Sequence, residues 1–136
     1  MKKPITIVAG LILKNDKLLC IKQDKGPYKG FVWIPAGHLE ARERLEEGTI
    51  REVKEETGLD VKVKKLIMKT KFCSQSFYLY LCNIIGGELS TKGEIKEIFW
   101  FSFNKILKSK KVHPLLYLVA LLSVHKPNFY KGIEES

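Results

Sequence analysis

The sequence predicts an α/β fold in which a mixed sheet is packed with at least two helices. The chain has 136 residues, of which 45% are hydrophobic, and this is enough to build one core without disulfides or a structural metal. Runs rich in β-branched and aromatic residues alternate with turn residues, and two segments carry helix signals. No repeat or long linker divides the chain, so we expect residues 1–136 to form a single domain.

The first half of the chain is expected to begin with a β-hairpin. Residues 5–23 contain two β-rich runs on either side of the turn formers Asn15 and Asp16. Further along, Pro35 stops a strand, and Gly58 is a natural residue to follow the last turn of a helix. In order, we expect a loop over residues 24–30, a short strand over 31–35 and a helix over 44–57.

The second half is expected to return to strands and then end in helices. Cys73, Ser74 and Gln75 separate two strand-like runs, and Pro114 begins a strongly apolar segment suited to a helix packed on the sheet. The tail from Lys126 onward lacks periodicity. The expected elements are strands over residues 59–72, 76–85 and 94–102, a short helix over 103–107 and a longer helix over 114–125.

The charges are distributed unevenly along the chain. The net charge is +9, yet residues 37–59 carry −3, so the remaining 113 residues carry +12. A basic surface attracts anions, which include nucleic acid, acidic membranes and phosphorylated small molecules. The seven carboxylates of the acidic stretch are Glu40, Glu43, Glu46, Glu47, Glu52, Glu55 and Glu56.

The cysteines and the apolar runs indicate a cytoplasmic protein. Cys20, Cys73 and Cys82 are odd in number and show no CxxC spacing, which favours buried free thiols in a reducing compartment. The N-terminal apolar run lacks a small-residue cleavage site, and no apolar run reaches about 18 residues. We therefore expect neither a targeting segment nor a membrane span.

Three carboxylates of the acidic stretch share one face of the expected helix. Because each helical residue advances about 100°, Glu52, Glu55 and Glu56 fall within an arc of roughly 100°, where like charges oppose folding. A bound Mg²⁺ or Mn²⁺ would relieve this repulsion, since both cations prefer carboxylate oxygens. Thr49 and Val53 would turn another face toward the core. The alternative is a solvated surface helix whose charges form i,i+4 ion pairs.

The complete pattern of the stretch decides between these alternatives. Gly37 is followed after five residues by Glu43 and after seven more by Arg51-Glu52-Val53-Lys54-Glu55-Glu56-Thr57-Gly58-Leu59. This resembles the Nudix box, Gx5Ex7REUxEExGU with U aliphatic, at every specified position. The resemblance implies the Nudix α/β/α sandwich around a mixed sheet. It also implies hydrolysis of a diphosphate linkage in a nucleotide-type substrate, with Mg²⁺ or Mn²⁺ as cofactor.

The resemblance also implies roles for individual residues. The metal ligands would be Glu52, Glu55 and Glu56, with the Gly37 carbonyl as an extra ligand. Arg51 and Glu43 would support them, since a bidentate guanidinium can hold a carboxylate in a fixed orientation. The general base varies within the family; here the candidates are Glu97, Glu94 and Glu52. The candidate substrate contacts are Lys22, Lys29, His38 and Tyr78.

The sequence departs from the common family pattern in the approach to the box. Ala36 stands where the family usually has Gly, and Arg42 replaces a usual Gly before Glu43. The segments PAGHLE and REVKEETGL are similar to a bacterial Nudix subgroup that acts on nucleoside tri- and diphosphates and on a thiamine-precursor pyrophosphate. Signatures typical of ADP-ribose or dinucleoside polyphosphate hydrolases are not cleanly met.

Several alternatives stay open on the sequence alone. ADP-ribose or dinucleoside polyphosphate hydrolysis is one, and hydrolysis at a capped or triphosphorylated RNA 5′ end is another. A Nudix-fold binding module that has lost hydrolysis would use the charge of +12 outside the box to hold nucleic acid or nucleotides. The oligomeric state is also open, with a homodimer as one outcome, and no membrane partner is expected.

Overall fold

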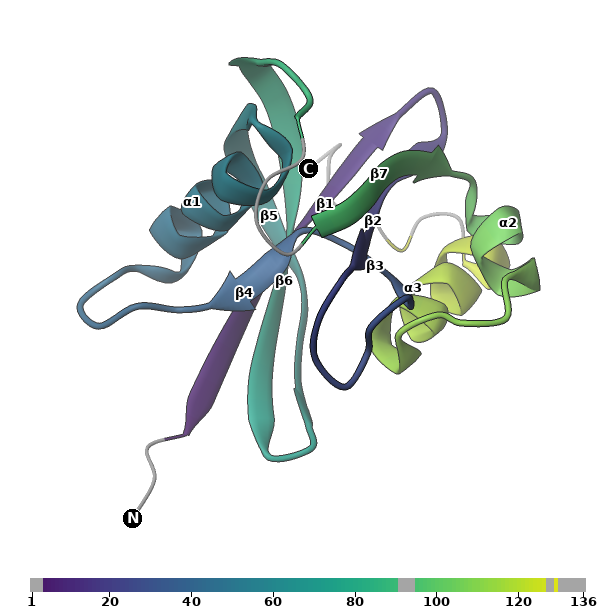
Figure 1. Cartoon of the computed structure of the whole chain (residues 1–136), viewed down its shortest axis with the longest axis horizontal. Helices are drawn as coiled ribbons and strands as arrows, with labels where there is room; N and C mark the ends of the chain where they lie inside the picture. The colour runs from purple at the N-terminus through teal and green to yellow at the C-terminus, as the bar shows by residue number, and fades with distance from the viewer. Residues whose placement is uncertain (1–3, 91–94, 127–128, 130–136) are drawn as a thin grey trace.

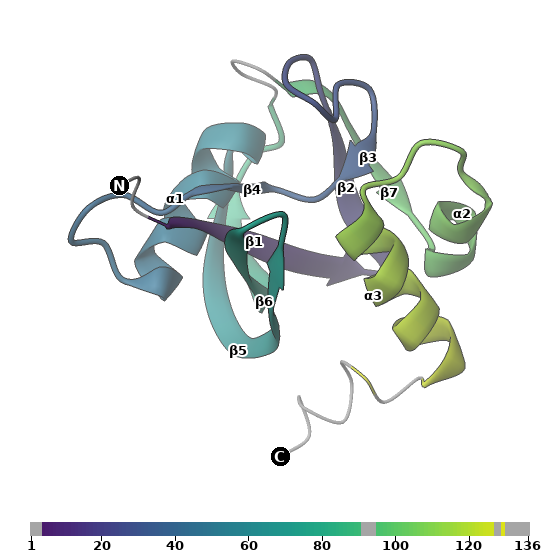
Figure 2. The ribbon, with the colours of Figure 1, turned by 90° about the horizontal axis from the view of Figure 1, so that it is seen from below.

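A computed structural model of the chain describes residues 4–90, 95–126 and 129, without the side chains of residues 95 and 96. The sheet lies between two helical layers (Figures 1 and 2). Helix α1 (Leu45–Thr57) covers one side, and helices α2 (Phe103–Lys108) and α3 (Pro114–His125) lie on the other. The α/β sandwich predicted from the sequence is confirmed.

The strands follow the predicted order with one addition. They are β1 (Ile5–Lys14), β2 (Lys17–Gln23), β3 (Val32–Trp33), β4 (Ala36–His38), β5 (Leu59–Phe72), β6 (Gln75–Gly87) and β7 (Ile95–Phe101). Strand β4 was not predicted, and the strand expected over residues 31–35 is only two residues long. Three residues carry too little periodicity to be recognised, and β4 exists because it pairs with β1.

The sheet is mixed because one central pair is parallel. The strand order is β3-β2-β1-β6-β5, with β4 paired to β1 and β7 paired to β2. Strands β1 and β6 run parallel, while the other paired strands are antiparallel. Strand β4, which contains the first residues of the box, pairs with one edge of β1. This pairing places Gly37 opposite Val8.

Two tight turns join the hairpins. Asn15 and Asp16 have φ values of 53° and 61°, the left-handed pair that a two-residue hairpin turn requires. Cys73 and Ser74 form a similar turn, with φ values of 51° and 64°. Gln75, which was expected to belong to this connection, instead pairs with Phe72 and begins β6.

Both faces of the sheet are buried, in two separate clusters. On the face toward α3, Leu79 and Leu81 pack with Leu116 and Val119 of the helix. On the face toward α1, Val53 packs with residues that include Ile12, Leu19, Tyr80 and Cys82. Because side chains alternate along β6, this strand contributes residues to both buried clusters.

Candidate active site

Helix α1 is defined by local signals at both ends. The Arg44 backbone N–H donates to Glu47 Oε1 at 3.0 Å, so Glu47 satisfies one of the free amides at the helix start. At the other end Gly58 has a φ of 81°, and its N–H donates to the Lys54 carbonyl at 2.9 Å. Glu47 is thus a capping residue of α1.

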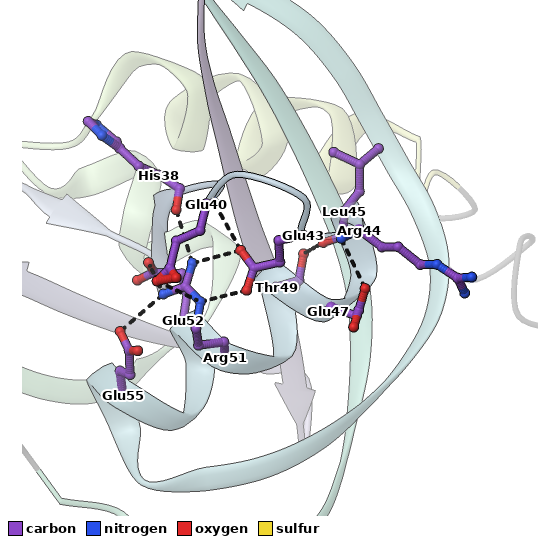
Figure 3. Close-up of polar contacts among 10 residues, drawn as sticks. All are labelled: His38, Glu40, Glu43, Arg44, Leu45, Glu47, Thr49, Arg51, Glu52 and Glu55. Carbon is purple, nitrogen blue, oxygen red and sulfur yellow. Dashed lines mark hydrogen bonds and ion pairs between the residues drawn. The ribbon is translucent and has the colours of Figure 1, made fainter.

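The guanidinium of Arg51 is the centre of the carboxylate cluster (Figure 3). Its Nε and Nη2 donate to the two oxygens of Glu43 at 2.7 and 3.0 Å, which is a bidentate pair. Its Nη1 donates to Glu52 Oε1 at 2.8 Å and to Glu55 Oε2 at 3.2 Å. Nη2 also donates to the His38 carbonyl at 3.0 Å. One side chain therefore ties together the loop, β4 and two carboxylates of α1.

The loop before α1 holds Glu43 in place for this pair. The Glu40 backbone N–H donates to Glu43 Oε1 at 3.0 Å, and Arg51 is bonded to the same carboxylate. These bonds lower the pKa of Glu43, with the Arg51 hydrogen bond as the largest cause. Gly48 permits the approach, because a Cβ there would lie 2.9 Å from Glu43 Oε1 and 2.7 Å from Leu39 Cδ1. The pair with Glu43 is also the main reason that the pKa of Arg51 is raised.

Strand β4 contacts the other side of the carboxylate cluster. The Ala36 backbone N–H donates to Glu56 Oε1 at 2.9 Å. Gly37 lies so close to Glu52 that a Cβ at this position would collide with the Glu52 carboxylate. Glycine is therefore required here for space, and the Gly37 backbone lies directly beside a proposed metal ligand.

Burial and like charges act together on Glu56. Its pKa is raised first by burial and then by the neighbouring carboxylates Glu52 and Glu55, and the Ala36 N–H offsets only part of this. A divalent cation would reverse the effect, because it favours the ionised form of each ligand. The oxygen donors thus fit Mg²⁺ or Mn²⁺ in chemical type.

The arrangement of the carboxylates is set by Arg51. Within the described part of the chain, no group of three or more His, Cys, Asp or Glu side chains already has the geometry of a metal site. Figure 3 shows that Glu52 and Glu55 both turn toward the guanidinium. Glu55 is more than half exposed, so its side chain can rotate toward a cation with little resistance.

An aromatic pocket of about 590 Å³ adjoins the carboxylate cluster at Gly37. The imidazole of His113 lies in its aromatic part, with ring centroids 4.0 Å from Trp33 and 4.4 Å from Tyr28. Phe72 and Phe77 complete the aromatic lining, at centroid distances of 5.7 and 6.1 Å from His113. The volume is in the range of pockets that hold small organic ligands.

The predicted substrate contacts are not all gathered at this pocket. His38 lines it and is exposed. Lys22 lies on β2, with its Nζ 5.7 Å from the centre of the Phe99 ring. Lys29 is exposed in the loop before β3, and Tyr78 packs beside the cluster on the α1 face of the sheet. None of these last three lines the pocket.

The two general-base candidates outside the box also differ in placement. Glu97 is exposed on β7, and its partner across the strand pair is Lys22 of β2. Glu94 lies outside the described residues. Glu52, the candidate within the box, is buried beside Gly37 and Arg51.

Sequence reasoning missed His113, Trp33 and the role of Glu40. His113 immediately precedes α3, and its backbone N–H donates to the Val32 carbonyl at 2.9 Å, which ties the helix to β3. The only local signal was a histidine one residue before Pro114, at a position suited to a helix cap. The expected burial of the thiols holds for Cys20 and Cys82, but Cys73 is exposed in its turn and lines the pocket.

Comparison with known proteins gives consistent results. The family model described as NUDIX domain matches residues 4–122. The ADP-ribose pyrophosphatase of Methanocaldococcus jannaschii is 36% identical over 77% of this chain and 66% of its own length. The human 8-oxo-dGDP phosphatase NUDT18 is 27% identical over 88% of this chain and 39% of its own length.

A crystal structure of a NUDIX hydrolase from Nitrosomonas europaea superposes with a TM-score of 0.83 at 22% identity, over 94% of this chain and 74% of the other. The chain spans between 31% and 66% of the length of the first three curated relatives. With the complete box on one helix and its loop, the family match over residues 4–122 shows that this chain belongs to the Nudix family.

Proposed function

We propose that the protein hydrolyses a diphosphate linkage in a nucleotide-type substrate, with Mg²⁺ or Mn²⁺ as cofactor. The observation that carries the proposal is the carboxylate cluster around Arg51 next to the aromatic pocket, with Gly37 at the boundary between them. A cluster of negative charge with no cation would repel a diphosphate, whereas the same cluster with a cation attracts it. The aromatic part of the pocket offers a place for a flat ring.

The residues of the box have distinct roles in this proposal. Glu52, Glu55 and Glu56 hold the cation, and the Gly37 carbonyl is an additional ligand. When bound, the cation would polarise a phosphoryl oxygen and offset the charge of the diphosphate. Arg51 and Glu43 keep the ligands oriented, which is a positioning role.

A carboxylate then accepts a proton from the attacking water as the water oxygen bonds to one phosphorus of the diphosphate; the bond from that phosphorus to the bridging oxygen breaks, and the other phosphate leaves with the bridging oxygen. Glu52 is favoured for this role because its carboxylate lies beside Gly37, at the proposed metal site. Glu97 stays an alternative on β7, opposite Lys22.

The substrate class is drawn from the relatives and from the pocket. The named relatives act on ADP-ribose and 8-oxo-dGDP, both nucleoside diphosphate derivatives. Nucleoside tri- and diphosphates come first in this proposal, and ADP-ribose, dinucleoside polyphosphates and an RNA 5′ end are alternatives. His38 is the substrate contact that the pocket lining favours, while Lys22, Lys29 and Tyr78 stay predictions.

The environment and assembly of the protein also stay proposals. None of the helices in the described residues is both long and apolar enough to cross a bilayer. Cytoplasmic location remains the expectation from the sequence, and a homodimer remains one possible assembly.

A binding module without hydrolysis is the second candidate. Strand β5 is at the edge of the sheet, and it exposes Lys62, Lys64, Lys65, Lys69 and Lys71. Such a row could contact nucleic-acid phosphates. However, lysines on an edge strand also prevent edge-to-edge association, which is sufficient reason for their presence. We therefore favour the enzyme.

The test is a substrate panel assayed with Mg²⁺, with Mn²⁺ and with a chelator. It should include nucleoside di- and triphosphates, ADP-ribose, dinucleoside polyphosphates and thiamine-precursor pyrophosphate, with separate detection of orthophosphate and pyrophosphate. Glu55→Gln and Glu56→Gln should each lower turnover by at least about a hundredfold. Glu88→Gln, which alters an exposed carboxylate after β6, is the matched control. Near-normal turnover in both box variants would refute the proposed metal site.

A further inference from the structure

The side chain of His113 has a fixed proton arrangement. Its Nδ1 accepts a hydrogen bond from the Leu115 backbone N–H at 3.1 Å, and a backbone amide can only donate. A neutral imidazole carries one proton, which must then be on Nε2. Burial lowers the pKa of His113 to about 4, so the ring is neutral near pH 7. Moving the proton to Nδ1 would break the bond that caps α3.

The Nε2–H group is accessible from the pocket. No fully buried side-chain nitrogen or oxygen among the described residues lacks a hydrogen-bond partner. Within the part of the chain that the structure describes, the His113 side chain is hydrogen-bonded at Nδ1, so Nε2 is not sealed among these residues. His113 is 5% exposed, and the space that it borders is the aromatic pocket. His113 therefore presents a hydrogen-bond donor among aromatic walls.

The surroundings of this donor suit a flat heterocycle. Trp33 stacks on the imidazole with an interplanar angle of 22°, while Tyr28 and Phe77 contact it at steeper angles. These rings favour a planar apolar surface, and the donor requires an acceptor on its edge. The rest of the lining includes Gly37 and His38, next to the carboxylate cluster, and the polar side chains of Gln23, Cys73 and Gln75.

We infer that His113 is a specificity-determining residue that selects nucleobases with a carbonyl oxygen on the edge remote from the sugar. The inference rests on the proposed function, which places the phosphates near Gly37 and so turns that edge of the base toward His113. Guanine and uracil present a carbonyl oxygen there, whereas adenine and cytosine present an amino group. The amino group of adenine or cytosine would place its N–H donor against the Nε2–H donor of His113. The proton cannot move to Nδ1 to relieve this conflict, because Nδ1 accepts the hydrogen bond from Leu115.

The first test measures binding without catalysis. Guanosine, uridine, adenosine and cytidine monophosphates are titrated into the wild-type protein in the presence of Mg²⁺, by calorimetry, because the carboxylate cluster without a cation would repel the phosphate. They contain no diphosphate, so no turnover is involved. The guanosine and uridine compounds should bind at least about tenfold more tightly than the adenosine and cytidine compounds. Equal affinity for all four, or no measurable binding by any, overturns the inference.

Cys73 provides a second readout in the unmodified protein. It is exposed and lines the same pocket, while Cys20 and Cys82 are buried, so a thiol reagent should react first at Cys73. Guanosine monophosphate should slow this reaction at concentrations that leave it unchanged with adenosine monophosphate. Equal protection by the two nucleotides contradicts the inference.

A variant tests whether the base preference comes from the Nε2–H group of His113. His113→Asn retains a side-chain oxygen that can cap α3, because Asn is a favoured residue at this position, but its shorter side chain withdraws the donor from the pocket. The preference for guanosine over adenosine monophosphate should fall to within about twofold. His125→Asn, the same change at the far end of α3, should retain it. Should His113→Asn fail to fold, the wild-type panel and the Cys73 readout decide.

The inference and the proposed function can fail separately. Hydrolysis of diphosphates without a base preference would leave the proposed function standing and overturn the role of His113. A base preference in binding, with no hydrolysis of any substrate in the panel, would support His113 and refute the proposed function.

Discussion

Replacing Arg51 by lysine tests whether the guanidinium positions the carboxylates or contacts the substrate. Arg51 makes five hydrogen bonds, two of them to Glu43 in a bidentate pair. A lysine ammonium has three donors on one nitrogen and cannot span both oxygens of a carboxylate while reaching a second one. At least two of the five bonds are therefore lost, although the positive charge is kept.

The magnitude follows from those bonds and from the exposure of the site. Charge-assisted hydrogen bonds contribute about 1.5–3 kcal/mol each when buried, but the Arg51 side chain is 22% exposed and its partner Glu55 is more than half exposed. We therefore expect a loss of about 2 kcal/mol in the free energy of unfolding. The effect on turnover should be larger, because a displacement of about 1 Å in a catalytic group can cost about a hundredfold in rate.

The assay compares kcat and KM of Arg51→Lys with those of the wild type at saturating Mg²⁺, together with denaturant unfolding. We expect kcat to fall about a hundredfold while KM changes little. Arg44→Lys is the matched control, since the Arg44 guanidinium points away from the carboxylates in Figure 3 and only its backbone N–H is bonded to Glu47. Unchanged kcat with a KM raised tenfold or more would make Arg51 a ligand of the substrate phosphate and refute the positioning role.

Three further predictions follow from the site. Gly37→Ala should lower kcat more than about tenfold, because its Cβ collides with Glu52, and normal kinetics would contradict this packing. Saturating Mg²⁺ should raise the melting temperature, since the cation relieves repulsion around Glu56 only in the folded chain, and an unchanged value would count against the metal site. The pKa of His113 is about 4 in the folded chain, below its ordinary value of 6.5, so the unfolded chain binds more protons between about pH 4 and 6.5. The free energy of unfolding should therefore have its full value above this pH range and fall by about 2–3 kcal/mol as the pH drops through it. His113→Asn should lose this pH dependence in denaturant titrations, and a dependence equal to that of the wild type would contradict the assignment.

The elements that the sequence predicted correctly are those with signals confined to a few neighbouring residues. The hairpin at Asn15 and Asp16 needed two residues that tolerate positive φ, and the end of α1 needed a glycine at position 58. The 3.6-residue period also predicted that Thr49 and Val53 would be buried, and both are. Such features depend on interactions between residues close together in the chain, so they can be predicted from the sequence without knowledge of the tertiary structure.

The elements that the sequence did not predict depend on contacts between distant segments. Strand β4, for example, forms because β1 lies beside it. Arg42 has a φ of 66° in the loop before Glu43, a left-handed conformation that its sequence could not reveal.

The candidate site divides in the same way. The spacing of the box determined that Glu52, Glu55 and Glu56 share a face of one helix. Only the tertiary structure brought Gly37 against Glu52, where a strand and a helix approach too closely for a side chain. Only the tertiary structure placed His113 among Trp33, Tyr28 and Phe77, because these rings come from separate parts of the chain and meet when α3 packs on the sheet. A linear pattern records which chemical groups a segment carries, but the closeness of groups from different segments is set by how the layers pack.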